Sequence, residues 1–186
     1  SKPNSFQQQT LELLQIDSTD FGYLNPSATK FRQLYLPVGI HRFSFTHPGA
    51  IKWLRAQLLP LDSCPHRRIF LSRQDAARRR LLNEEKIINR LKPHGFEVIV
   101  PSSLSVADQI EVFSQAEIVV GPHGSSFANM VFASSQAKMI EIHSPHWALG
   151  FYRTLAWMMG QQHGQVIGLT QGPLENPKVQ DYVADP

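Results

Sequence analysis

The segment EIVVGPHGSS, residues 117–126, runs from an apolar stretch directly into a loop of glycine, histidine and serine. A short apolar run bounded by turn-forming residues is typical of a strand buried inside a parallel sheet. The loop leads into a short helical pattern that places Phe127, Met130 and Val131 on one side. A strand, a loop and a helix in this order predict a βα unit, the repeating element of α/β folds.

Short strands alternate with helical patterns on both sides of this segment. A capping box at Ser105 and Asp108 predicts a helix start, and apolar residues follow it at the spacing of one helix face. Asn83 is placed to cap an earlier helix. The predicted strands are residues 33–37, 68–72, 96–100, 117–120, 138–142 and 165–168, and the other predicted helices are residues 6–14, 47–59 and 149–159.

We therefore predict an α/β fold with a doubly wound, Rossmann-like parallel sheet and helices on both faces. Residues 33–170 are expected to form this domain. Residues 1–32 do not fit the alternation and are interpreted as a border segment, which links to a neighbouring domain or is its remnant. Residues 171–186 contain three prolines and are predicted to form a C-terminal tail without a packed element.

Composition excludes several classes of protein. With 42% hydrophobic residues among 186, the chain can bury a core, so disorder is excluded as its main state. No apolar run has the ~20 residues of a membrane span, and the first residues carry no signal peptide. We therefore predict a cytoplasmic or membrane-peripheral location. The single cysteine, Cys64, excludes an internal disulfide and a cysteine-based zinc site.

Charge is concentrated in one stretch of the chain. The net charge is +3, but residues 67–92 carry nine basic and three acidic side chains. A local basic patch of this kind is suited to bind an anion. Aromatic residues do not alternate with the basic ones as they do where nucleic-acid bases stack, so a small phosphate-bearing molecule is favoured over nucleic acid.

Two polar segments follow predicted strands, at the carboxyl ends where open α/β sheets bind ligands. The first, residues 72–80, begins with Ser72 and Arg73 and ends with three arginines. Arg73 follows its strand immediately, and its planar guanidinium suits bidentate contacts with phosphate. Three consecutive arginines cannot all point the same way, so Arg78 either contacts a ligand or belongs to a solvated face.

The second segment, residues 121–126, combines small residues with hydrogen-bond donors. Gly121 and Gly124 are expected to let the backbone approach a ligand closely and to adopt conformations that other residues avoid. The helix that starts near Ser125 and Ser126 directs free N–H groups at the loop, which suits phosphate, and Asn129 lies one turn further. The spacing is neither a Walker A loop nor GxGxxG, which argues against an ATPase or a dinucleotide-binding dehydrogenase.

Histidine and carboxylate side chains supply further candidates. His123 is expected to point into the cleft, either as a structural hydrogen-bond donor to a loop carbonyl or as a phosphate donor or general acid/base. Glu141 lies inside an apolar strand and is either an acceptor for a ribose hydroxyl or part of a structural ion pair with an arginine. His143 and His146 lie three apart, but Pro145 breaks any helix and no third ligand is evident, so no metal site is predicted.

These segments resemble glycosyltransferase family 61. Residues 69–85, IFLSRQDAARRRLLNEE, resemble its segment ISR-x-D-A-x-x-R-R-x-x-N-E, and the loop at residues 121–124 with Asn129 resembles its G-x-H-G-A-x-x-x-N loop. Residues 140–142 resemble its V-I-E-I strand, and residues 6–16 resemble a bacterial member of the family. Ser125 stands where alanine is common in the family.

The resemblance implies one half of a GT-B architecture, in which two Rossmann-like domains face each other across a cleft. The chain is then the C-terminal, donor-binding domain, and residues 1–32 border the acceptor domain. The resemblance implies inverting, metal-independent transfer of a sugar to a glycan or other hydroxyl acceptor, in polysaccharide or glycoconjugate synthesis. The implied donor is a nucleotide sugar carrying uridine diphosphate (UDP), with no further cofactor. A bacterial member would be cytoplasmic or membrane-peripheral.

His123 and Arg73 are then the predicted catalytic residues, because a metal-free enzyme needs preorganised positive charge where the departing diphosphate becomes negative. The predicted donor-binding residues are Arg73, Arg78, Gly121, His123, Gly124, Ser125, Ser126, Asn129 and Glu141. The general base is expected from the acceptor domain, and the oligomeric state is left open. The alternative is a non-catalytic module that binds a nucleotide or a carbohydrate.

Overall fold

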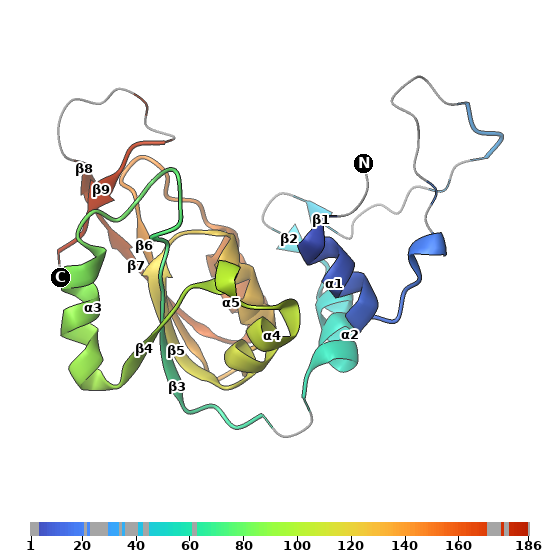
Figure 1. Cartoon of the computed structure of the whole chain (residues 1–186), viewed down its shortest axis with the longest axis horizontal. Coiled ribbons are helices and arrows are strands. Elements are labelled where there is room, and N and C mark those ends of the chain that lie inside the picture. The colour runs from blue at the N-terminus through green and yellow to red at the C-terminus, as the bar shows by residue number, and fades with distance from the viewer. Residues whose placement is uncertain are drawn as a thin grey trace.

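A parallel sheet of five strands forms the centre of the molecule, with the strand order β4-β3-β5-β6-β7 (Figure 1). The computed structural model describes residues 4–20, 22, 30–33, 35, 41–42, 45–60, 63–170, 176 and 179–185. The strands of this sheet are β3 (Arg67–Leu71), β4 (Phe96–Ile99), β5 (Ala116–Pro122), β6 (Lys138–His143) and β7 (Gln162–Ile167). The predicted parallel α/β sheet is confirmed.

Short antiparallel pairs lie outside this sheet. They are β1 (His41–Arg42) with β2 (Phe45–Thr46), and β8 (Leu169–Thr170) with β9 (Tyr182–Val183). The strand predicted at residues 33–37 falls largely outside the described residues. The strand predicted at 165–168 is the end of the longer β7.

Helices cover both faces of the sheet, as the doubly wound prediction requires (Figure 1). One face packs against α4 (Val106–Ser114), the 3-10 helix η4 (Ser125–Phe132) and α5 (Phe151–Met159), and the other against α3 (Glu84–Leu91). The helix α2 (Pro48–Leu58) packs against η4. The other helical segments are α1 (Ser5–Leu13), η1 (Ser18–Asp20), η2 (Lys92–His94) and η3 (Pro101–Ser103). None of the helices in the described part of the chain has the length and apolar character that a membrane crossing needs.

Successive side chains of the central strands belong to two separate hydrophobic cores, one on each face of the sheet. In β3, Ile69 and Leu71 join the core beneath α4 and η4, whereas Phe70 joins the core beneath α3. Side chains alternate across a strand, so a strand covered on both faces must be apolar at every position. This is why continuous apolar runs in the sequence correctly predict the central strands.

Local signals set the helix ends. Ser105 Oγ accepts a hydrogen bond from the Asp108 N–H, and the Asp108 carboxylate accepts one from the Ser105 N–H, which confirms the predicted capping box. Gly160 ends α5 in the left-handed conformation at φ 70°. Asn83 occupies the predicted N-cap position of α3, but its side chain makes no capping hydrogen bond. It instead bonds the N–H and the carbonyl oxygen of Ala184, at 3.1 and 2.6 Å.

The last described residues pack against the sheet, so the prediction of a tail without a packed element is wrong. Tyr182 is only 1% exposed, and its hydroxyl donates to the carbonyl oxygen of Ile142 at 2.8 Å. Tyr182 and Ala184 join α3 in covering one face of the sheet. Burial of the Tyr182 side chain offsets part of the free-energy cost of ordering this segment.

Candidate functional site

The order of the sheet reverses at β3. The chain passes from β3 to β4 on one side, and the next strand, β5, pairs with β3 on its other side. The loops that leave neighbouring strand ends at such a switch point diverge and form a crevice. Arg73 follows β3 and His123 follows β5, and Arg73 Nη1 donates to the His123 carbonyl oxygen at 2.6 Å. The structure therefore brings the two predicted catalytic residues together.

Gly124 makes this contact possible. A side chain there would place its Cβ 3.1 Å from Cδ and Nε of Arg73, so glycine lets the guanidinium lie against the loop. Gly121 instead allows β5 to pack closely against β3, because a Cβ there would lie 2.6 Å from the Leu71 carbonyl oxygen. Neither glycine is among the described residues with positive φ. The expected unusual backbone conformation is therefore wrong, whereas the close approach of these glycines to a ligand stays a prediction.

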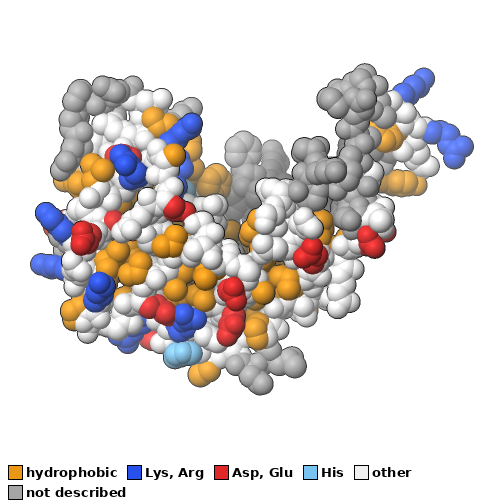
Figure 2. Space-filling model, viewed as in Figure 1, with side chains coloured by type: hydrophobic (Ala, Val, Ile, Leu, Met, Phe, Trp, Pro, Cys, Tyr) orange, Lys and Arg blue, Asp and Glu red, His pale blue; other side chains and the backbone are white. Residues whose placement is uncertain are grey.

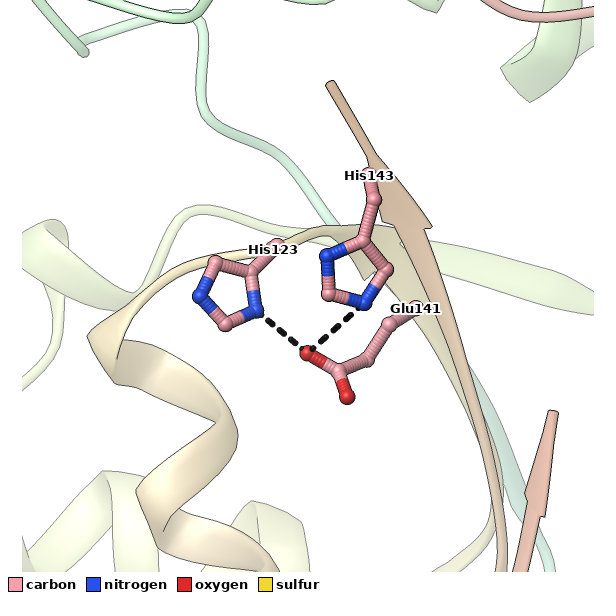
Figure 3. Close-up of side chains that lie close together, drawn as sticks. All are labelled: His123, Glu141 and His143. Carbon is pink, nitrogen blue, oxygen red and sulfur yellow. Dashed lines mark hydrogen bonds and ion pairs between the residues drawn. The ribbon is translucent and has the colours of Figure 1, made fainter. Parts of the chain in front are cut away.

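Three histidines surround the buried carboxylate of Glu141. His123 Nδ1 lies 2.5 Å from Oε2 and His163 Nε2 lies 2.7 Å from Oε1. His143 Nε2 lies 3.6 Å from Oε2, and its ring stacks on that of His123 with centroids 4.7 Å apart. Figure 3 shows that the second ring nitrogen of His123 points away from Glu141.

Glu141 is charged although its side chain is fully buried. Burial raises the pKa of Glu141, but hydrogen bonds from the three histidines outweigh this effect and lower the pKa to about 2. An ionised carboxylate only accepts hydrogen bonds, so His123 carries a proton on Nδ1, and its Nε2 is the atom left for a ligand.

Neither of the two roles predicted for Glu141 matches this geometry. Its partners are histidines, and no arginine of the described residues pairs with it. The carboxylate is 0% exposed and both oxygens are hydrogen-bonded, so it does not reach a ribose hydroxyl. Glu141 supports His123 from below the crevice instead of lining it.

The cluster also contains the donor atoms of a possible metal site, since those of His123, Glu141 and His143 lie within 4.8 Å of one another. However, ring nitrogens of both histidines point at the same carboxylate oxygen (Figure 3), so hydrogen bonds already offset the charge that a metal would neutralise. The sequence carries a signal for part of this cluster: Glu141 and His143 lie two apart in one strand, and such residues share a face of the sheet. His163 joins only through the register of β6 with β7.

Aromatic rings close the crevice beside His123. The ring centroid of Tyr152 lies 5.5 Å from that of His123 and 5.8 Å from that of Phe127. Burial, followed by the charge of Glu141, raises the pKa of Tyr152 to about 12. The phenol therefore stays protonated at neutral pH. Tyr152 comes from α5, and the packing of this helix places its ring next to His123.

The three consecutive arginines diverge, as predicted. Arg78 is exposed, and Arg80 pairs with Asp181 at 2.6 and 2.9 Å. Arg79 is half-buried, with its guanidinium carbon 5.2 Å from the centroid of the Trp147 ring. The predicted ligand contact of Arg78 stays a prediction. The two consecutive arginines of the family segment fall on Arg79 and Arg80.

The start of η4 presents two serines to the loop. Ser125 is exposed and Ser126 is half-buried in the first turn, where backbone N–H groups have no partner within the helix. Asn129 lies further along η4, but its Nδ2 donates to Gln109 Oε1 in α4 at 2.7 Å. This hydrogen bond ties η4 to α4, and the ligand contact of Asn129 stays a prediction.

Acid is expected to destabilise the fold through Glu141. Its pKa of about 2 lies below the ordinary 4.5, so its contribution to stability is present above pH 4.5 and is lost as the pH falls towards 2. The shift corresponds to roughly 3 kcal/mol of unfolding free energy. Glu141→Gln should be less stable than the wild type at pH 7, and its free energy of unfolding should fall less on acidification. Urea titrations at several pH values test this, with the exposed Glu111→Gln as the matched control, and an unchanged pH slope in Glu141→Gln contradicts it.

Comparison with known proteins agrees with this geometry. A family model described as Glycosyltransferase 61 matches residues 6–140, which is more than half of the chain. No curated protein matches the sequence. The matched span contains both loops of the crevice, with Arg73 and His123. The chain therefore belongs to glycosyltransferase family 61 and is a glycosyltransferase.

Proposed function

We propose that the crevice at the switch point binds the diphosphate of a UDP-sugar, and that the sugar passes with inversion to a hydroxyl acceptor without a metal ion. The product would be a polysaccharide or a glycoconjugate. One observation carries the proposal: Arg73 and His123, 50 residues apart, lie at the ends of neighbouring strands, where the Arg73 guanidinium donates to the His123 carbonyl oxygen. No carboxylate of the described residues forms an ion pair with the Arg73 guanidinium. An unpaired cation beside a histidine is an arrangement suited to an anionic ligand.

The transfer needs positive charge where the bond breaks. The acceptor oxygen attacks the anomeric carbon while the bond from that carbon to the diphosphate breaks. The electron pair of this bond leaves with the nucleoside diphosphate, and the acceptor proton passes to a base. Arg73 and the N–H groups at the start of η4, near Ser125 and Ser126, would stabilise the growing negative charge from the two loops.

His123 would act through Nε2, because Nδ1 is bound to Glu141. In the protonated ring Nε2 donates to a phosphate oxygen, and in the neutral ring it accepts the proton of the acceptor. Both roles need the same ring orientation. Glu141 is therefore a positioning residue that holds the ring and fixes its tautomer.

The domain would be the donor half of a GT-B enzyme. The crevice lies at the carboxyl ends of β3 and β5, the edge that a second domain must face to present an acceptor. In this proposal residues 1–32 border the acceptor domain. That domain supplies the general base if His123 binds phosphate.

UDP is expected to stabilise the protein in the presence of EDTA. Ligand at 100 times its Kd adds ~2.7 kcal/mol, which corresponds to about 5–10 °C in the thermal midpoint of a domain of this size. Differential scanning fluorimetry with UDP, and with uridine as a control that lacks the diphosphate, measures the shift. No shift with millimolar UDP, or a shift that appears only when Mg²⁺ or Mn²⁺ is added, contradicts the proposal.

A further inference from the structure

Arg79 is half-buried, and like Arg73 it has no carboxylate partner among the described residues. Three other arginines of this basic stretch each have one: Arg67 with Glu97, Arg68 with Glu117, and Arg80 with Asp181. In Figure 2 the Lys and Arg side chains near α3 are likewise interspersed with acidic ones. Arg79 has no ion-pair partner among the described residues, and its Nε is buried without a hydrogen bond. Its guanidinium lies over the Trp147 ring.

A second unpaired cation lies within electrostatic reach of Arg79. Burial, followed by the positive charge of Arg73, lowers the pKa of Arg79. Two like charges, one of them partly removed from water, repel each other more strongly than they would in solution. Their proximity is unfavourable unless an anion lies between them.

The backbone holds Arg79 in a conformation that arginine rarely adopts. Its φ of 51° lies in the left-handed region, which residues with a bulky side chain avoid. Such strain persists only where the surrounding structure fixes it, and it concentrates at ligand sites. Here residues 179–185, which we call the C-terminal strap, supply the restraint. The Arg79 N–H donates to the Val179 carbonyl oxygen at 3.1 Å.

The C-terminal strap also separates Arg79 from its neighbour. Asp181 accepts hydrogen bonds from the Arg80 backbone N–H at 2.7 Å and from the Arg80 guanidinium at 2.6 and 2.9 Å. The Tyr182 N–H donates to the Arg80 carbonyl oxygen at 3.0 Å. Arg80 is thereby bound to the strap and Arg78 is exposed. Arg79 is the half-buried arginine of the three, and the positive charge of Arg73 contributes to lowering its pKa.

We propose that Arg79, rather than Arg78, is the second diphosphate-binding residue of the crevice, and that the C-terminal strap positions it. This inference rests on the proposed function and names a further part of the same site. Arg73 and Arg79 would bind the phosphates of one nucleoside diphosphate through their guanidinium N–H groups. Contact with the Trp147 ring would keep the Arg79 guanidinium in place.

Calorimetric titration with UDP tests the role of Arg79. Arg79→Gly is the first variant, because glycine adopts a positive φ without strain and so preserves the loop. We expect it to bind UDP roughly 10–100-fold more weakly, the usual effect of losing charge-assisted hydrogen bonds. Arg79→Lys keeps the charge without the planar fork and should recover only part of the affinity. Arg90→Ala, an exposed arginine on α3, is the control for one lost charge and should bind like the wild type.

The role of the strap is tested by a double-mutant cycle. Asp181→Asn alone is expected to weaken UDP binding, because it releases Arg80 and with it the conformation of Arg79. In the Arg79→Gly background Asp181→Asn should have no further effect on UDP affinity, whereas a merely structural effect would add to the first.

The outcomes separate this inference from the function on which it rests. Wild-type protein that does not bind UDP overturns the proposed function, and the inference falls with it. Wild-type protein that binds UDP, together with an Arg79→Gly variant that binds equally well, overturns the inference alone. It is also overturned if Arg78→Ala loses as much affinity as Arg79→Gly, or if Asp181→Asn weakens binding equally in both backgrounds.

Discussion

Arg73→Ala is expected to slow the release of UDP from a UDP-sugar by roughly 100–1000-fold. The Arg73 guanidinium lies at the end of β3, 2.6 Å from the carbonyl oxygen of His123, where the proposed diphosphate departs. Removing it leaves the growing negative charge with one preorganised donor fewer. Hydrolysis of the donor, in which water takes the place of the acceptor, can be followed by an assay for free UDP.

A folding check and the Arg73→Lys variant serve as controls for this experiment. The Arg73 backbone N–H donates to Glu84 at 3.3 Å in any variant, so the loop should stay folded, which thermal unfolding checks. Arg73→Lys retains the charge but loses the planar fork, and it should recover only a small part of the turnover. A folded Arg73→Ala protein that turns over like the wild type would show that the crevice is not the site of reaction.

Replacing His123 by alanine should reduce turnover by roughly 100–10,000-fold, the range associated with a lost general acid or base. The effect on UDP affinity distinguishes the two roles left open for Nε2. If Nε2 binds phosphate, affinity and turnover fall together. If Nε2 accepts the proton of the attacking group, turnover falls while UDP affinity is nearly kept.

The variant also has a structural cost. Glu141 Oε2 loses its nearest donor, at 2.5 Å, and a buried charge with a missing hydrogen bond destabilises a fold by about 1–3 kcal/mol. The His123→Ala protein should therefore be assayed at a temperature well below its lowered thermal midpoint. His146→Ala is the matched control, because His146 is exposed and does not contact Glu141. Unchanged turnover in folded His123→Ala protein would remove His123 from the mechanism.

The elements that the sequence predicts correctly are those whose causes are local. The Ser105–Asp108 capping box involves residues three apart, and the apolar runs of β3 and β5 follow from burial on both faces. Arg73 is predictable for the same reason, since a residue directly after a strand must emerge at the strand end. Local physics therefore suffices to identify these strands and to place Arg73 at a strand end.

The failures share a long-range cause. Asn83 has the right residue type for a helix cap, but its partner Ala184 is 101 residues away. The burial of Tyr182 depends on a face of the sheet that the preceding elements leave uncovered. Asn129 Nδ2 likewise has its partner, Gln109, 20 residues earlier in the chain. No periodicity or local motif reports such partners.

The same limit applies to the histidine cluster and to Arg79. His123, Glu141 and His163 come from three segments, and only the strand order and the register of β6 with β7 bring them together. Arg79 is distinguished from Arg78 by a backbone angle that the C-terminal strap imposes. In both cases the residue types are visible in the sequence, but their arrangement is a property of the folded chain.

A crystal structure of the protein with UDP tests the joint binding of one diphosphate by two distant loops most directly. We expect phosphate oxygens at about 3 Å from both the Arg73 guanidinium and His123 Nε2. Nucleotide bound elsewhere on the molecule, with neither side chain in contact with a phosphate, would contradict the proposed site.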